Sequence, residues 1–321
     1  MKIGVVGTSF IMDTILDNMN KTKGMDIVSI YSRTPSKAEV LMKKFNIPVI
    51  FNSYSEMCSY DKIDWIYICS PNSVHYSQAK EALLSGKNVL LEKPSTVHLN
   101  ELKELRDIAV QNNLFLFEAI IPMFHPNYNI IKENIEKLGH LKLGMGTFLQ
   151  YSSRYDALLK GNIANVFNPD FAGGCLMDLN LYNIYFFCGL FGKPDKVEYS
   201  ARLYKNGIDT NGVVSLFYKD MICECIAAKD CSGDNSAQII GEKGYIKVTP
   251  CASNLKKVEV NIRGQEPAVY ETDENPWSYE MTGLVDIVSR NDLDECYRRL
   301  DTALCVCETL EKARKNGGLN F

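Results

Sequence analysis

Three polar residues carry the chemistry that this sequence suggests first. Lys93 lies in Glu92-Lys93-Pro94, where a buried apolar run ends in a charged pair and a proline. Proline biases the preceding residue toward an extended backbone, which would aim the Lys93 ammonium beyond the strand end. Asp178 and Tyr182 are four residues apart, so a helix would present them on one face. A cation, a carboxylate and a phenol are suited to proton transfer at an alcohol or carbonyl.

The carboxylate of Asp178 needs an explanation of its own, because its surroundings in the sequence are apolar. Burying a carboxylate is unfavourable unless a cation pairs with it, and we expect Lys93 to be that partner. The alternative is an acid favoured by the positive end of the helix dipole, with Tyr182 as a core residue. The spacing alone leaves both interpretations open.

A glycine turn after the first apolar run predicts a dinucleotide site. The pattern G-x-G-x-x-G/A is met only at Gly7, because Ser9 replaces the second glycine and Met12 the third. A serine hydroxyl can nevertheless donate to a phosphate at a helix N-terminus. The alternative is an ordinary strand-turn-helix. The residues that we expect to bind cofactor here are Gly7, Thr8, Ser9, Phe10 and Ile11.

The end of the second apolar run bears on the choice of cofactor. An acid usually binds the ribose 2′-hydroxyl of NAD at this point, whereas a 2′-phosphate favours arginine. The sequence has Ser32 and Arg33 here. We therefore favour NADP(H) over NAD(H), the alternative being a solvated arginine in a polar loop.

The elements that would position these residues follow from hydrophobic periodicity. Up to about Ala119, short apolar runs alternate with amphipathic stretches, which is typical of βα units and a doubly wound parallel sheet. The predicted strands are Lys2–Val6, Ile27–Tyr31, Val49–Phe51, Trp65–Cys69, Asn88–Leu91 and Leu114–Phe117. Ligands bind at the carboxyl ends of such strands. That rule adds further cofactor candidates, namely Ser70, Pro71, Asn72, His75, Glu92, Lys93 and Glu118.

The pattern changes after about Ile120, where period-two alternation predicts a largely antiparallel open sheet. A helix is expected from about Cys175 to Cys188, and a last one at about residues 296–314. The predicted fold class is α/β plus α+β. Residues 1–120 would form a Rossmann domain that binds NAD(P), and residues 121–321 a domain for substrate binding and oligomerisation. The last helix is expected in the second domain or packed back on the first.

Length and composition exclude several classes of protein. A chain of 321 residues exceeds the roughly 250–300 residues at which a single core stops growing. The net charge is −4 and no basic run exceeds a pair, so we expect no nucleic-acid partner. The longest stretch free of charged residues and of histidine, residues 179–192, is too short to span a membrane, and the N-terminal apolar run is too short for a secretory signal.

Cysteine and histidine usage supports the same class. The 11 cysteines are scattered and lack metal or redox spacing, so we expect a cytoplasmic protein with reduced thiols. The four histidines do not stand at metal-ligand spacing, and we expect no metal site. We interpret His98, His125 and His140 as structural or surface residues.

Taken together, the motifs resemble those of the Gfo/Idh/MocA oxidoreductases. The resemblance covers nearly the whole chain. The segments that carry it are the turn at Gly7, Ser70-Pro71-Asn72 with His75, Glu92-Lys93-Pro94, Phe117-Glu118-Ala119 with Phe124-His125-Pro126, and Phe171-Ala172-Gly173-Gly174 through Asp178 and Tyr182. It implies a Rossmann domain, a C-terminal open-sheet domain, an active site between them, and a homodimer or higher homo-oligomer. It also implies NAD(P) chemistry on sugars and related alcohols.

The resemblance assigns roles to the three polar residues. Lys93 matches the active-site lysine and Asp178 the family's acid. Tyr182 stands where many members carry histidine but the glucose-fructose oxidoreductase and dihydrodiol dehydrogenase types carry tyrosine. We expect Tyr182 to donate or accept the proton, with the Lys93 ammonium favouring its phenolate or stabilising the oxyanion. Asp178 would orient Lys93 or a substrate hydroxyl, while Ser70, Asn72 and His75 would line the nicotinamide and its ribose.

Two other functions are compatible with the same motifs. One is a regulatory protein that senses NADP without catalysis, which the weakened glycine motif would suit. The other is an NAD-assisted hydrolase or epimerase of a sugar. Retention of Lys93, Asp178 and Tyr182 disfavours the sensor, since a sensor needs no proton donor.

Overall fold

The computed structural model describes residues 1–272 and 275–321, and these form two compact units. The first unit contains residues 1–120 and 277–304, and the second contains residues 121–276 and 305–321. The division at residue 120 lies where the hydrophobic period changes. Residues 277–304 pack with the first unit although they follow the second sheet in the chain, and they include the beginning of the last helix.

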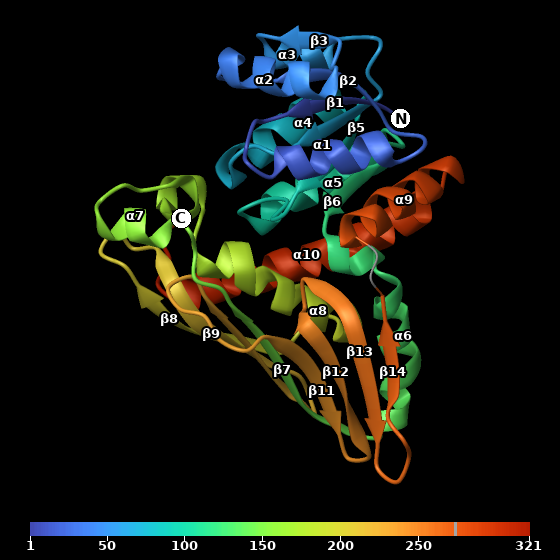
Figure 1. Ribbon diagram of the computed structural model, residues 1–321, viewed down its shortest axis with the longest axis vertical. Coiled ribbons are helices and arrows are strands. Elements are labelled where there is room, and N and C mark those ends of the chain that lie inside the picture. Colours follow the sequence, from blue (N-terminus) through green and yellow to red (C-terminus); the bar gives the residue numbers. More distant parts are fainter. Residues whose placement is uncertain (273–274) are drawn as a thin grey trace. The chain divides into compact units, whose positions relative to one another are not determined.

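The first unit is built on a parallel sheet of six strands in the order β3-β2-β1-β4-β5-β6 (Figure 1). Its strands are β1 (Lys2–Val6), β2 (Asp26–Tyr31), β3 (Val49–Phe51), β4 (Trp65–Ile68), β5 (Asn88–Glu92) and β6 (Leu116–Ala119). Each predicted strand is present. The strand order reverses beside β1, so the carboxyl ends of β1 and β4 flank the switch point at which such sheets bind ligands.

Helices of the first unit form where apolar residues recur at three- and four-residue spacing. They are α1 (Met12–Lys21), α2 (Pro35–Phe45), α3 (Tyr54–Cys58), α4 (His75–Leu84), α5 (Leu99–Gln111), α9 (Pro276–Ser289) and the beginning of α10 (Leu293–Asn316). Thr34 is the N-cap of α2, and Pro35 follows it in the first helical position that proline favours. We did not predict α9.

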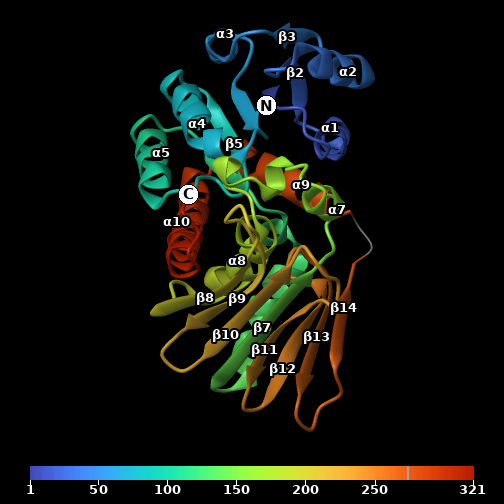
Figure 2. The same cartoon turned by 90° about the vertical axis from the view of Figure 1, so that its left-hand side faces the viewer.

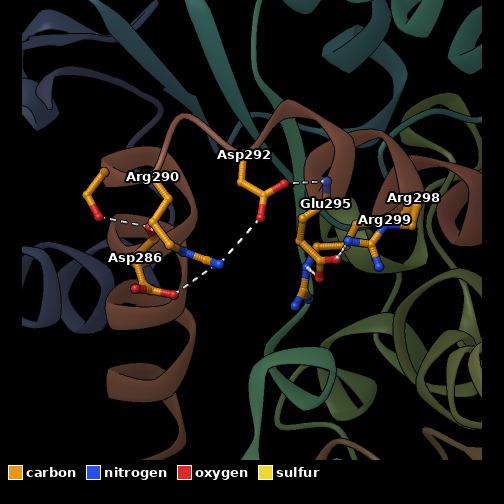
Figure 3. A network of polar contacts seen from close by, with 7 residues as sticks. Asp286, Arg290, Asp292, Glu295, Arg298 and Arg299 are labelled. Carbon is orange, nitrogen blue, oxygen red and sulfur yellow. Dashed lines mark hydrogen bonds and ion pairs between the residues drawn. The ribbon is translucent and has the colours of Figure 1, made fainter.

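The α9–α10 hairpin joins the first unit through both packing and charge. Leu300 of α10 is buried in the cluster that includes Leu105 and Leu116. The turn between the helices carries a network of ion pairs and hydrogen bonds (Figure 3). In it, Arg290 pairs with Asp286 at 3.0 Å and with Asp292 at 3.4 Å. The charged groups of this network pair with one another within the hairpin. We infer that the network stabilises the turn.

The second unit is built on a sheet of eight strands in the order β14-β13-β12-β11-β7-β10-β9-β8 (Figure 2). Every adjacent pair is antiparallel except β7 with β10, so the predicted, mostly antiparallel sheet is confirmed. The strands are β7 (Leu141–Leu149), β8 (Lys196–Leu203), β9 (Asp209–Phe217), β10 (Ile222–Ala228), β11 (Ser236–Gly241), β12 (Gly244–Cys251), β13 (Asn254–Ile262) and β14 (Ala268–Glu271). The short edge strand β14 was not predicted.

A buried helix covers one face of this sheet where we predicted one. It begins as a π-helical turn (Leu176–Asn180) and continues as α8 (Leu181–Phe191). Gly144 and Gly146 of β7 let it approach closely, because an added Cβ would lie 2.6 Å from Phe187 and 2.8 Å from Asn183. The helix is therefore held against β7 at a distance that larger side chains would prevent.

The remaining elements are the other helices of the second unit and several short 3₁₀ helices. The second unit also contains α6 (Pro126–Asn134), α7 (Tyr155–Leu159) and the end of α10. Short 3₁₀ helices are Asn72–Val74, Ile121–Phe124, Ile135–Leu138, Asn165–Phe167 and Pro169–Phe171. Across residues 1–272 and 275–321, no helix combines the length and apolarity that crossing a membrane requires.

Candidate functional site

The turn after β1 has the backbone geometry of a dinucleotide site. Gly7 has a φ of 110°, and an added Cβ would collide with the carbonyl oxygen of Cys69 at the end of β4. Only glycine therefore fits where the two strand ends meet. The turn leads into the N-terminus of α1, with the Ser9 and Phe10 side chains exposed. Small residues, hydroxyls and a helix N-terminus fit a pyrophosphate, so these residues fit NAD(P).

The end of β2 lies beside this turn and has no acidic side chain. The hydroxyl of Ser32 is 3.3 Å from that of Thr8 and accepts a hydrogen bond from the Thr34 amide at 3.2 Å. Ser32 is buried, whereas Arg33 is exposed. The buried hydroxyl fixes the loop, and the guanidinium is left accessible to a ligand.

His75 ties together the ends of β4 and β5. It is fully buried, with Nδ1 2.9 Å from the carbonyl oxygen of Pro94 and Nε2 2.9 Å from that of Ser70. Burial lowers the pKa of the imidazole. Each ring nitrogen faces a backbone carbonyl oxygen, and the single N–H of the neutral imidazole donates to one of the two, so the buried ring can shape a cofactor site at Ser70 and Pro94. The Ser70 hydroxyl in turn donates to Gln78 at 2.6 Å.

Acidic side chains fix the backbone on both sides of Lys93. Glu92 accepts hydrogen bonds from the Tyr67 hydroxyl and, at 3.2 Å, from the Lys93 amide. The buried carboxylate of Glu118 accepts one from the Ser95 amide at 3.0 Å. The Glu-Lys-Pro segment is thus held by its neighbours rather than free as a surface turn would be.

Another carboxyl group, Glu280 of α9, is buried near this segment. Its exposed fraction is 0%, and neither oxygen has a hydrogen-bond partner among the residues that the structure describes. Burial, reinforced by the negative charge of Glu92, raises the pKa of Glu280 well above its ordinary value. Sequence reasoning missed Glu280, because α9 was not predicted.

In the second unit, Asp178 lies in the π-helical turn and Tyr182 in the first turn of α8. Both side chains are half-buried. The Tyr182 ring is 5.9 Å from that of Phe148, centroid to centroid. π-Helical turns inside α-helices occur frequently at functional sites. The structure thus places the predicted pair on one short segment.

Buried polar side chains fasten this segment to the sheet. Asn180 donates to the carbonyl oxygen of Cys225 at 2.9 Å, and Asn183 donates to that of Ile226 at 3.2 Å and to the Asn180 side chain at 3.0 Å. Asn180 and Asn183 are each 0% exposed. Because their hydrogen bonds reach β10, the helix cannot rotate without leaving buried amides unpaired.

Asp209, which sequence reasoning also missed, holds the start of the same helix. Its carboxylate accepts hydrogen bonds from the Leu176 amide and the Tyr199 hydroxyl, both at 2.6 Å. Gly174 has a φ of 104°, and an added Cβ would collide with the Asp209 carboxylate. Burial raises the pKa of Asp209. The Gly-Gly motif therefore makes room for the acid that anchors the helix N-terminus.

Asp178 has an ion-pair partner that was not anticipated. Lys229, the residue after β10, pairs with its carboxylate. Lys229 carries the same signal in the sequence as Lys93, because each is a lysine at the end of an apolar strand. The pairing of Asp178 with Lys93 remains a prediction.

The histidines set aside earlier have structural or surface places. His125 is buried, and its Nδ1 accepts a hydrogen bond from the Asn127 amide at 3.1 Å, which caps α6. Burial lowers the pKa of His125 to about 4. His98 and His140 are exposed. No group of three or more potential metal ligands occurs in the part of the chain that the structure describes.

Comparison with known proteins gives consistent matches over both units. Residues 1–119 match the family described as "Oxidoreductase family, NAD-binding Rossmann fold", and residues 132–247 match the "GFO/IDH/MocA C-terminal domain". The scyllo-inositol 2-dehydrogenase (NADP(+)) IolU of Bacillus subtilis is 31% identical, over 100% of this chain and 98% of its own length. The trans-1,2-dihydrobenzene-1,2-diol dehydrogenase of Mus musculus is 27% identical, over 100% and 98%.

Among solved structures, KijD10 has a similar fold. This 3-ketoreductase from Actinomadura kijaniata was crystallised with NADP and TDP-benzene. The TM-score is 0.86 at 18% identity, and the match covers 98% of this chain and 97% of that one. The fold class predicted from hydrophobic periodicity is thereby confirmed.

Proposed function

Since the chain belongs to the Gfo/Idh/MocA oxidoreductases, we propose that it transfers hydride between NADP(H) and a carbon bearing a hydroxyl or carbonyl group in a sugar, cyclic polyol or dihydrodiol. NAD(P)-dependent oxidoreduction is shared with the relatives, which are dehydrogenases of inositol and of a dihydrodiol. These relatives favour catalysis over a purely sensory role. The substrate class, the preference for NADP(H) and the residue roles are our proposal.

The observation that carries this proposal is the pairing of Asp178 and Tyr182 on a rigidly held helix. A phenol and a carboxylate one turn apart can address neighbouring oxygens of a polyhydroxylated substrate. Tyr182 then protonates the developing alkoxide during reduction and accepts the proton during oxidation. Asp178 accepts a hydrogen bond from a second hydroxyl and fixes the orientation of the substrate.

Lys93 is proposed to serve the same reaction. The hydrogen bond from its amide to Glu92 holds the backbone, which fixes where the side chain leaves the strand end. A cation near the reacting oxygen stabilises negative charge on that oxygen and favours the phenolate form of tyrosine. Bound nicotinamide supplies or takes up the hydride. The protein contributes binding, orientation and control of the proton.

The preference for NADP(H) rests on the end of β2. No carboxylate stands there to bind a ribose 2′-hydroxyl, and the exposed Arg33 can pair with a 2′-phosphate. The named cofactor of IolU and the NADP bound to KijD10 support this choice.

Two measurements test the proposed function. Fluorescence titration compares NADPH with NADH, and turnover is then followed at 340 nm with inositols, other cyclic polyols, sugars and dihydrodiols in both directions. We expect tighter binding of NADPH and turnover of at least one of these substrate classes. Absence of NADPH binding near millimolar concentration would refute the proposal.

We further propose a homodimer in which the second sheet of one copy meets that of another. Leu143 and Met145 of β7 and Ile222 of β10 are exposed by 47%, 40% and 39%. Leu143 and Ile222 are register partners, so they share a face of the sheet. Exposed apolar residues grouped on one sheet face support association with a second copy.

Cytoplasmic localisation likewise remains a proposal, supported by the scattered free cysteines.

A further inference from the structure

Lys229 is a buried lysine at the end of β10. Its side chain is 5% exposed, and its backbone is fixed on both sides. The Lys229 amide donates to the carbonyl oxygen of Thr210 at 2.8 Å, and its own carbonyl oxygen accepts a hydrogen bond from the Ser152 amide at 2.8 Å. A lysine held in this way cannot readily extend its ammonium into water. It therefore requires an anion close by.

That anion is the carboxylate of Asp178, with which the Lys229 ammonium forms an ion pair. The pair is asymmetric, because the Asp178 side chain is 34% exposed while the lysine is enclosed. On the inner side, the ammonium is 5.8 Å from the centroid of the Phe167 ring. The lysine thus approaches Asp178 from within and leaves part of the carboxylate facing solvent.

Other titratable groups surround the pair but have donors of their own. Asp209 accepts hydrogen bonds from the Leu176 amide and Tyr199, and Asp230 accepts one from the Asn211 side chain at 2.7 Å. Cys175 lies within electrostatic range of all three acids and of Lys229, and burial raises its pKa well above the ordinary value. A neutral thiol and two otherwise bonded acids favour Asp178 as the partner of Lys229.

We infer that Lys229 is a positioning residue for Asp178, which holds that carboxylate ionised and oriented toward a substrate hydroxyl. The inference rests on the proposed function, because it concerns the residue that we assign to substrate orientation. Lys229 and Asp178 both belong to the second unit. The carboxylate is therefore set in place before cofactor or substrate binds, and it serves as a hydrogen-bond acceptor rather than a proton donor.

A double-mutant cycle on thermal stability tests the pair without requiring activity. Asp178→Asn leaves a buried ammonium without its anion and should lower the melting temperature by roughly 5–10 °C. Lys229→Met should cost less, because water can reach the exposed part of the carboxylate. The double variant should melt above Asp178→Asn alone. Strictly additive effects would overturn the ion pair and with it the inference.

The pH dependence of kcat/KM tests positioning as distinct from stability. In Lys229→Met the acid limb of the profile should move to higher pH, because the carboxylate protonates more readily without the adjacent ammonium. Lys229→Arg should retain the wild-type limb. Lys219→Met removes an exposed lysine of the same unit and is the control, which should match wild type.

The outcomes separate the inference from the proposed function. Wild-type turnover with an unchanged profile and unchanged kcat in Lys229→Met would overturn the inference and leave the function intact. Absence of wild-type turnover with every substrate class and both cofactors would overturn both. A shifted acid limb in Lys229→Met, restored in Lys229→Arg, would support both.

Discussion

The phenol of Tyr182 can be removed with little change in packing, because phenylalanine keeps the ring that contacts Phe148. We expect Tyr182→Phe to lower kcat by roughly 10²- to 10⁴-fold, the usual contribution of a positioned acid or base. The dissociation constant for NADPH should change less than twofold, since the role that we propose for the phenol concerns the substrate and not the cofactor. Steady-state kinetics and fluorescence titration measure the two effects. An unchanged kcat would remove Tyr182 from the proton-transfer role.

We also expect one side chain, that of Arg33, to determine the proposed preference for NADP(H). Arg33→Ala should weaken NADPH binding roughly tenfold or more, because a charge-assisted hydrogen bond to phosphate is lost. NADH binding serves as the internal control, since NADH has no 2′-phosphate. Titration of wild type and variant with both cofactors gives the ratio. Equal losses for both cofactors would contradict recognition of the 2′-phosphate by Arg33.

Glu280 predicts a stability that depends on pH. Its pKa is raised in the folded state, so the unfolded chain binds fewer protons once the pH exceeds about 4.3, and stability falls as pH rises. Glu280→Gln cannot ionise and should therefore increase the free energy of unfolding at pH 7. This advantage should disappear near pH 4.

Urea unfolding at pH 4 and pH 7 measures the effect of Glu280→Gln. Glu39→Gln, an exposed substitution in the first unit, is the control and should show no such difference. A Glu280→Gln variant that is less stable than wild type at pH 7 would mean that the native carboxylate is ionised and paired.

At the scale of elements, the start of the π-helical turn depends on Gly174. Gly174→Ala combines a strained positive φ with a collision against Asp209, whereas Gly192→Ala has a φ of 74° and no atom within 4 Å of the added Cβ. The difference between the two variants isolates the collision. We expect Gly174→Ala to destabilise by at least about 2 kcal/mol more than Gly192→Ala. Denaturant unfolding compares them, and equal losses would contradict the role of Asp209.

Periodicity predicts most of the elements but not the partners within the site. Alternating βα signals locate all six strands of the first sheet, because every run is apolar and all but the half-buried edge strand β3 are largely buried. Met281, Leu284 and Ile287, which are buried in α9, also stand at helical spacing in the sequence. By contrast, the Lys229–Asp178 pair joins residues 51 positions apart, and only tertiary structure brings them together.

The residues of the candidate site likewise fall into those that the sequence marks and those that it does not. Gly7, Lys93, Asp178 and Tyr182 stand out because turn chemistry, a proline and helical spacing mark them locally. Residues that orient them, such as Asp209, have no local mark, since a strand that begins with aspartate is common in any fold. The place of His75 after the fourth strand predicts it as a site residue, but nothing in the sequence predicts that its imidazole is fully buried.

At the scale of the whole molecule, the proposed dimer should dissociate when charge enters the exposed sheet face. Leu143→Glu places a carboxylate beside its apolar register partners Ile222 and Ile240 and should yield monomers of about half the wild-type mass. Light scattering coupled to gel filtration measures the mass. Phe10→Glu, an exposed apolar position in the first unit, is the control and should leave the mass unchanged. A wild-type monomer would refute the proposed dimer.

The packing of α10 on the first unit has a consequence for folding during translation. Leu300 completes the core of the first unit, and Cys296 donates a hydrogen bond to the carbonyl oxygen of Leu116 at 3.2 Å across 180 positions of sequence. When residues 1–120 leave the ribosome, the segment that covers part of their core has not yet been synthesised. That nascent sheet must wait, with apolar surface uncovered, until the whole second sheet has been translated. Slow translation of residues 121–276 would therefore lengthen its exposure to chaperones and proteases.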